Sequence, residues 1–248
     1  MQVNDYIAVI RGESAALADS ADLAGLDAAV PYCPGWQVRD VVQHTGGVQR
    51  WATAYVARGR VEPFDDEEEA AFFTAPEDEA LVAWFRTGGA ALADTLASAD
   101  PDLAAFQFLP AASPRLFWAR RQAHEVAIHR ADADAAAGRA SAYDPAFAAD
   151  GIAELISCFH ARSRSKLVAD PPVSLSVRAT DADCAWTIRI EPAGRVITPE
   201  ALEADCALTG PASDLYLALW NRRSTDGIDL RGDASVFDLW RERSPITW

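Results

Sequence analysis

Three side chains that can bind a metal or move a proton occur close together in the segment 118–132, Trp-Ala-Arg-Arg-Gln-Ala-His-Glu-Val-Ala-Ile-His-Arg-Ala-Asp. They are His124, Glu125 and His129. The segment is predicted to be helical, and helical residues four apart lie about 40° apart around the axis, so Glu125 and His129 share one face. His124 and His129 are separated by roughly 140° and cannot chelate one ion together. The spacing is therefore not the His-Glu-x-x-His motif of zinc proteases, and the Glu125–His129 pair needs a third ligand from elsewhere.

Only His44 and His160 remain as further histidines. A helix is expected over 36–58, and His44 falls on its apolar stripe, which turns the side chain inward. The stripe consists of Val38, Val41, Val48, Trp51 and Tyr55. A lone histidine in such a place is more often a hydrogen-bonded core residue than a ligand. His160 follows Cys158 by two positions, which points the two side chains to opposite sides of a helix, so we expect a structural role for it.

Glu125 leaves two interpretations open, because a buried carboxylate is costly unless it has a partner. One is an ion pair with a nearby arginine of the same helix; the candidates are Arg120, Arg121 and Arg130. The other is a metal site formed by His44, Glu125 and His129. Two imidazoles and one carboxylate are typical of catalytic zinc, with a fourth position open for water or substrate.

Such a metal site would carry a net charge near +1 and would favour an anion such as a thiolate or hydroxide. Asp40 precedes His44 by one helical turn, and Asp132 follows His129 by three residues. Each carboxylate is placed to accept the second ring proton of its histidine, although surface solvation is an equal alternative for both.

Composition limits the class of protein. The chain has 248 residues, half of them hydrophobic, and its 37 acidic against 22 basic residues give a net charge of -15. Such a surface repels phosphate backbones, so nucleic-acid binding is disfavoured. The sequence has no run of about eighteen apolar residues and no export signal, which predicts a soluble cytoplasmic protein without membrane contact. The four scattered cysteines, at positions 33, 158, 184 and 206, are then expected to be free thiols.

The apolar periodicity changes near residue 169, which predicts a helical domain over 1–169 and a small α+β domain over 170–248. Helices are expected over 4–27, 36–58, 76–99, 114–137 and 145–168, with an acidic, solvated loop over 62–69. Strands are expected over 173–179, 185–190, 195–198, 205–209 and 228–231, and helices over 211–220 and 233–242. No Gly-x-Ser-x-Gly nucleophile motif and no phosphate loop occurs.

Several motifs together resemble the mycothiol-dependent maleylpyruvate isomerase family. The segment 33–47, Cys-Pro-Gly-Trp-Gln-Val-Arg-Asp-Val-Val-Gln-His-Thr-Gly-Gly, is similar to that family's CPGW-x-V-x-D-L-x-x-H-x-GG segment. The segment 118–132 is similar to its W-x-x-R-x-x-H-E-x-x-x-H-R-x-D helix. Towards the C-terminus, 208–215, 219–222 and 231–234 resemble the family's G-P-x-x-D-L, L-W-G-R and GDA segments. The resemblance spans nearly the whole chain.

The resemblance implies a DinB-like four-helix bundle with zinc or another divalent metal on His44, Glu125 and His129, followed by a sterol-carrier-like α+β domain that closes the cleft. It also implies a reaction in which the thiol of mycothiol adds to a cis double bond of an unsaturated acid, and rotation and elimination give the trans isomer. Arg222 matches a family arginine that holds a substrate carboxylate, although a surface charge after a helix is an equal alternative. Asn221 replaces the usual glycine before it. An actinobacterial source fits the alanine- and aspartate-rich, lysine-poor composition.

Metal ligands carry over within a family more safely than substrates do. A mycothiol S-transferase for detoxification or natural-product synthesis is therefore an alternative to an isomerase. A metal-bearing protein that binds a small ligand without turnover is a third possibility. The sequence does not indicate the physiological substrate or the oligomeric state.

Overall fold

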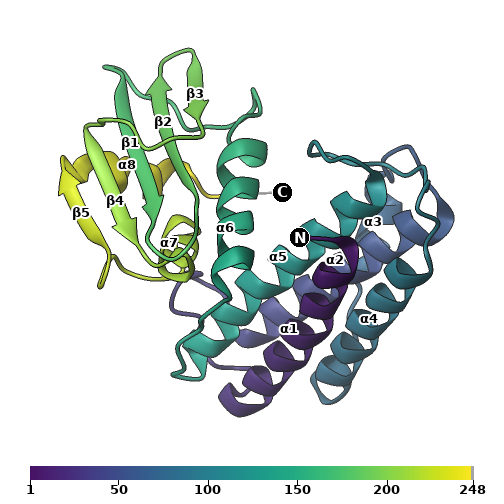
Figure 1. The fold of residues 1–248 in the computed structure, drawn as a ribbon. Helices are drawn as coiled ribbons and strands as arrows, with labels where there is room; N and C mark the ends of the chain where they lie inside the picture. The colour runs from purple at the N-terminus through teal and green to yellow at the C-terminus, as the bar shows by residue number, and fades with distance from the viewer. Residues whose placement is uncertain (247–248) are drawn as a thin grey trace. The chain divides into compact units, whose positions relative to one another are not determined.

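The computed structural model describes residues 1–246, and the chain divides into two compact units, Met1–Ser141 and Ala142–Trp248 (Figure 1). The named elements of the first unit are all helices, and the second unit combines helices with one sheet. A helical N-terminal region followed by a small mixed domain is the fold class that the sequence predicts, and it is confirmed.

The first unit is built from four long helices and one short helix. These are α1 (Val3–Ala24), α2 (Val38–Arg58), α3 (Asp66–Phe72), α4 (Asp78–Ser98) and α5 (Pro114–Ala136). Helix α1 packs on α4 and α5, and α2 packs on the same two helices, so the four long helices form a bundle. The short α3 lies in the connection between α2 and α4 (Figure 1).

Local sequence sets the ends of the two helices that carry the candidate ligands. Helix α2 begins with a capping box in which the Asp40 carboxylate accepts a hydrogen bond from the Gln37 backbone at 2.8 Å. It ends at Gly59, whose φ of 57° is left-handed. Helix α5 begins at Ser113, whose hydroxyl accepts the Leu116 N–H at 3.2 Å, with Pro114 in the first turn.

Helix α5 is buried on almost every side, which places its polar groups inside the bundle. Trp118 is fully buried, and its indole N–H donates to the Phe106 carbonyl at 2.9 Å. The polar residues of the same helix are also buried; they are Arg121, Gln122, His124, Glu125, His129, Asp132 and Asp134. Buried polar groups of this kind need specific partners, so α5 is where the bundle can hold a polar site.

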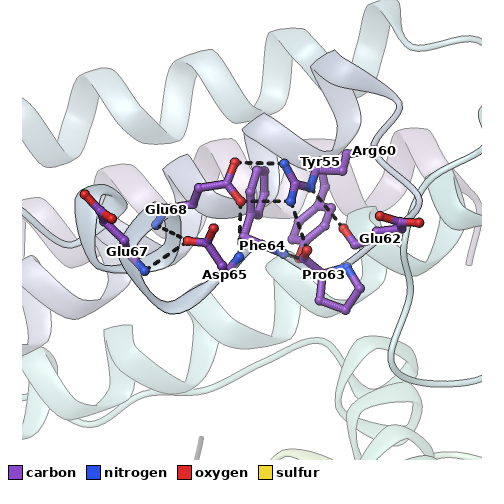
Figure 2. A network of polar contacts seen from close by, with 8 residues as sticks. All are labelled: Tyr55, Arg60, Glu62, Pro63, Phe64, Asp65, Glu67 and Glu68. Atoms are coloured by element: carbon purple, nitrogen blue, oxygen red, sulfur yellow. Dashed lines mark hydrogen bonds and ion pairs between the residues drawn. The ribbon is translucent and has the colours of Figure 1, made fainter.

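The acidic run expected as a loop over 62–69 instead begins helix α3, and this expectation was wrong from Asp66 onward. The Asp65 carboxylate caps the helix by accepting the backbone N–H groups of Glu67 and Glu68 at 3.1 and 2.9 Å. Arg60 holds both carboxylate oxygens of Glu68 at 2.8 Å, and the Phe64 N–H donates to the Tyr55 hydroxyl at 3.0 Å (Figure 2). Acidic residues in the first turn stabilise a helix, because their negative charge lies near the positive end of the helix dipole. An acidic run can therefore begin a helix as well as form a solvated loop.

The second unit contains a five-stranded sheet in the order β3-β2-β1-β4-β5. The strands are β1 (Val173–Ala179), β2 (Ala185–Glu191), β3 (Gly194–Thr198), β4 (Cys206–Gly210) and β5 (Asp229–Gly232). Among the strands of the described residues, the β1–β4 pair is parallel and the other three pairs are antiparallel. Helices α7 (Ala212–Leu219) and α8 (Ala234–Arg243) pack on β1 and β4.

The helix predicted over 145–168 differs from expectation in extent and in place. It comprises α6 (Pro145–Ala153) and a π-helix, η1 (Glu154–Phe159), after which residues 160–172 form no helix. Helix α6 packs against α7, so it belongs to the second unit, and the compact units meet at 141/142 rather than near 169. The apolar face of 145–159 predicts a helix, but it does not indicate whether this helix packs in the core of the first unit or in that of the second.

No helix in the described part of the chain is long and apolar enough to cross a membrane. All four cysteines lie among the described residues, and they are present as thiols and not as disulfides.

Candidate metal centre

The structure brings His44, Glu125 and His129 together inside the bundle. One ligand atom from each, two imidazole nitrogens and a carboxylate oxygen, lie within 4.8 Å of one another. His44 comes from α2, and the other two come from α5. Among the described residues, this is the group of histidine, cysteine and acidic side chains arranged to hold an ion.

Glu125 lies at the middle of the group. Its Oε1 is 3.1 Å from His44 Nε2 and 3.3 Å from His129 Nε2. Its Oε2 accepts a hydrogen bond from Arg121 at 2.9 Å, in an ion pair between neighbouring turns of α5. The sequence left open an ion pair with an arginine and a metal site. In the structure Oε2 of Glu125 forms the ion pair, and Oε1 faces the two histidines.

Asp132 fixes the orientation of His129. Its Oδ2 lies 3.0 Å from His129 Nδ1, and its side chain is fully buried. When the ring loses one proton to bind a metal, Asp132 retains the proton on Nδ1, and the Nε2 lone pair is then on the side of Glu125. Of the two alternatives that the sequence leaves open for Asp132, the structure shows the contact with His129, whereas Asp40 uses its carboxylate to cap α2.

Burial and charge compete at these groups. Burial alone would raise the pKa of Glu125, but hydrogen bonds from His129 and His44, with the charges of His129 and Arg121, hold that pKa well below its usual value. Burial alone would lower the pKa of His129, but Asp132 and Glu125 raise it to about 9. The raised pKa of His129 shows that the neighbouring carboxylates favour positive charge at this ring, and the lowered pKa of Glu125 shows that its carboxylate stays ionised.

Aromatic rings form the remaining walls near the histidines. The Trp36 ring is parallel to the His129 ring at 6.2 Å and meets the His44 ring edge-on at 5.4 Å. The Phe73 ring lies 6.2 Å from that of His44. The His44 side chain keeps 21% of its surface exposed, more than Glu125 or His129, so the group opens to solvent beside His44.

Two glycines of α2 allow aromatic side chains to lie close against this helix. A Cβ at Gly46 would stand 2.2 Å from Trp84, and one at Gly47 would stand 2.4 Å from Phe73. Neither distance is compatible with a side chain, so the Gly-Gly pair after His44 has a packing role. Phe73 and the packing role of Gly46 and Gly47 were not predicted, because contacts between segments far apart in sequence carry no local signal.

The other reactive residues named from the sequence lie elsewhere. His124 is fully buried against the Tyr6 ring of α1, on a different face of α5 from His129. His160 belongs to the second unit, where its Nδ1 lies 3.0 Å from the Ser165 hydroxyl. Neither is part of the three-residue group.

Arg222 also belongs to the second unit, directly after α7, and its guanidinium donates to the Trp220 carbonyl at 2.9 Å. Asn221 before it adopts a φ of 60°, the left-handed conformation that glycine takes most easily. Asparagine is among the residues that best tolerate this region, so its replacement of the family's glycine keeps the backbone turn. The Asn221 amide also donates to the Arg241 carbonyl at 3.0 Å.

The donor set fits a divalent cation. Zinc binds imidazole nitrogen and carboxylate oxygen, and a set of two histidines and one glutamate is found at its catalytic sites. The Nδ1 partner of His129 and the Oε2 partner of Glu125 are the outer contacts that metal-binding side chains commonly have.

Comparisons with known proteins agree with these features. The model of the mycothiol maleylpyruvate isomerase N-terminal domain matches residues 7–134, and that of the corresponding C-terminal domain matches residues 146–239. No curated protein sequence matches the chain.

Solved structures show the same fold. A crystal structure of a mycothiol-dependent maleylpyruvate isomerase superposes with a TM-score of 0.63 at 14% identity, covering 93% of each chain. A point mutant of a mycothiol-dependent maleylpyruvate isomerase gives 0.64 at 12% identity, again over 93% of each chain. The two domain models together span most of the sequence, and the chain belongs to the mycothiol maleylpyruvate isomerase family.

Proposed function

We propose that this protein is a metal-dependent enzyme that uses mycothiol to isomerise an unsaturated acid from cis to trans. The observation that carries the proposal is the convergence of His44, Glu125 and His129 within 4.8 Å, in a chain of the mycothiol maleylpyruvate isomerase family. The solved structures with the same fold are described as mycothiol-dependent maleylpyruvate isomerases, which supplies the candidate substrate and thiol.

Zn²⁺ or another divalent metal is the proposed cofactor, held by His44, Glu125 and His129. When bound, such an ion supplies a Lewis acid that favours the thiolate form of a thiol at neutral pH. The donors are one anion and two neutral imidazoles, so the loaded site would keep a net charge near +1, which attracts a thiolate.

The chain's own residues prepare this site. Arg121 holds Oε2 of Glu125 and leaves Oε1 directed at the two imidazoles. Asp132 keeps the Nδ1 proton of His129 away from the site, and Trp36 restricts both rings. This preorganisation means that little rearrangement is needed when the ion and the thiol bind.

The proposed reaction balances without an oxidant or reductant. The thiolate sulfur adds to one carbon of the cis double bond, and the electron pair moves onto the conjugated carbonyl of the acid. Rotation about the resulting single bond and expulsion of the same thiolate restore the double bond in the trans geometry. We propose Arg222 as the residue that holds a substrate carboxylate, because a guanidinium can bind a carboxylate through two hydrogen bonds.

The decisive experiment incubates metal-loaded protein with maleylpyruvate, with and without mycothiol, and follows the trans product. Thiol-dependent isomerisation that is lost on chelation supports the proposal. Stable thioether products from electrophiles would instead indicate a mycothiol S-transferase. Saturable ligand binding with no product under any thiol would indicate a non-catalytic binding protein. We propose that the reaction takes place in the cytoplasm, where the cysteine thiols and a thiol cosubstrate remain reduced.

A further inference from the structure

A small cavity in the second unit is surrounded by positive charge. It has a volume of about 80 Å³ and lies between the loop after η1 and the end of α8. Its cationic lining residues are Arg162, Arg164, Lys166 and Arg243. No acidic side chain is among the described residues that line it, although the whole chain carries a net charge of -15. Such a local reversal of charge favours an anionic ligand.

Two buried nitrogens at this cavity have no hydrogen-bond partner among the described residues. They are Nε2 of His160 and Nη1 of Arg162, and both residues line the cavity. His160 is only 2% exposed, and its Nδ1 is 3.0 Å from the Ser165 hydroxyl. Buried polar atoms without partners are uncommon, and two at one cavity indicate a missing acceptor.

The His160 ring is neutral, so it can donate one proton without adding charge. Burial, together with the nearby charges of Arg195 and Arg162, lowers its pKa to about 3. When Nδ1 accepts from the Ser165 hydroxyl, the proton lies on Nε2. The ring also packs edge-on against Trp240 at 4.9 Å, which fixes its plane.

Arg195 of β3 holds the basic loop in shape. Its guanidinium donates to four backbone carbonyls of the loop, those of His160, Arg162, Ser165 and Leu167, at 2.8, 2.6, 3.1 and 3.1 Å. These four carbonyl oxygens are thus already engaged. Arg195 therefore holds the backbone of the loop that carries the donors and cations of the cavity.

We propose that this pocket, defined as His160, Arg162, Arg164, Lys166 and Arg243, binds a small tetrahedral oxyanion, either free phosphate or the phosphoryl group of a small metabolite. A single water needs only about 10–15 Å³ of such space, so the cavity has room for a larger group. Arginine forks bind phosphate oxygens in pairs, and a neutral N–H adds directional recognition. This site uses no residue of the metal centre and is independent of the proposed isomerase activity.

The test follows the histidine signals of metal-loaded, full-length protein by NMR during titration with inorganic phosphate. A parallel titration with sodium chloride matches the ionic strength. We expect a saturable shift of the His160 resonances with phosphate and none with chloride, since a dianion accepting from Nε2 changes the ring environment. A second titration with glycerol 3-phosphate distinguishes a phosphate ester from the free ion as the preferred ligand.

Variants locate the response. The double variant Arg164→Gln, Arg243→Gln alters exposed side chains, so it retains the fold, and we expect phosphate affinity to fall at least about tenfold. Arg189→Gln is the matched control, because it removes an exposed arginine of the same sheet domain outside the pocket, and affinity should not change. A His160 shift that chloride reproduces, or that persists with full affinity in the double variant, would overturn the proposal.

Discussion

Glu125 uses its two carboxylate oxygens for different partners. Arg121 takes Oε2 at 2.9 Å, and Oε1 lies between the Nε2 atoms of two histidines. A carboxylate held in this way has one oxygen fixed by the protein and one available to a cation. The buried Arg121–Glu125 pair therefore has a positioning role as well as satisfying the buried charge.

His129→Ala should abolish stoichiometric metal binding while leaving a folded bundle. The substitution removes one of three donors but leaves most of the apolar core of α5 intact. Metal content by elemental analysis and helicity by circular dichroism measure the two effects. Asp40→Asn is the control, because it weakens the α2 capping box without touching a proposed ligand. Full metal occupancy in His129→Ala would remove this residue from the ligand set.

Asp132→Asn should weaken metal affinity about 10- to 100-fold, since an amide does not hold the Nδ1 proton of His129 as a carboxylate does. Competition against a chromophoric chelator measures the change. Asp134→Asn is a matched control on the same helix. Asp134 is buried, but it accepts from Ser20 and Ser141 and pairs with Arg130. The Asp134→Asn protein should be less stable but keep its metal affinity. Equal losses of metal affinity in both variants would argue against a specific role for Asp132.

Arg222→Ala should raise KM for a substrate carboxylate by more than it lowers metal content. The loss of a charged hydrogen bond to an anion costs about 1.5–3 kcal/mol, roughly a tenfold to hundredfold change. Steady-state kinetics and elemental analysis separate the two effects. The neighbouring Arg223→Ala is the control, as Arg223 pairs with Asp214 within the same unit. Unchanged kinetics in Arg222→Ala would exclude this residue from the substrate site.

How far the site can be predicted depends on the range of each contact. The helical spacing of Glu125 and His129, and the inward face of His44, are local properties that the sequence states directly. The approach of His44 to α5 depends on how two helices pack. It was predicted from the family resemblance and not from residue spacing. The Trp36 stack and the approach of Phe73 depend on loops, whose paths no periodic pattern encodes.

At the scale of elements, α3 and the two glycines of α2 determine what stands beside His44. The Asp65 cap and the Arg60–Glu68 pair fix the start of α3 (Figure 2). Phe73 follows the last residue of this helix. The absence of a side chain at Gly47 lets the Phe73 ring lie against α2. Helix starts at proline and caps are readable from sequence, whereas an acidic helix that buries none of its residues is not.

Gly47→Ala should destabilise the first unit by about 1–3 kcal/mol, because its Cβ would stand 2.4 Å from Phe73 and the ring must move. Displacement of Phe73 should also alter the surroundings of His44. Chemical denaturation measures stability, and His44 NMR signals report the site. Gly12→Ala on α1 is the control: nothing lies within 4 Å of its Cβ, so the higher helix propensity of alanine should stabilise by about 1 kcal/mol. Equal effects of the two substitutions would contradict the packing role.

At the scale of the whole molecule, the two units hold histidines in opposite electrostatic settings. In the first, Glu125 and Asp132 raise the pKa of His129, which is the setting of a cation site. In the second, burial and the charges of Arg195 and Arg162 lower the pKa of His160 to about 3, which is the setting of an anion site. The net charge of -15 is a property of the whole chain and does not indicate the local charge around either histidine. Composition therefore predicts which polymers the protein avoids but not which small ligands its two units accept.

The low pKa of His160 should make the second unit less stable in mild acid. In the unfolded chain His160 takes up a proton as pH falls through its ordinary value of 6.5, while the folded state resists protonation until about pH 3. The unfolded state therefore binds more protons across this window, and the free energy of unfolding falls with decreasing pH by up to about 1.4 kcal/mol per unit. Denaturation at several pH values, in buffers free of oxyanions, measures the slope.

The variant His160→Gln should flatten this slope between pH 6.5 and 5, where most carboxylates remain ionised. An unchanged slope in that range would show that His160 is not buried as a neutral base. Adding phosphate to the wild-type protein should restore part of the lost stability, because an anion at Nε2 offsets the cost of protonating the ring.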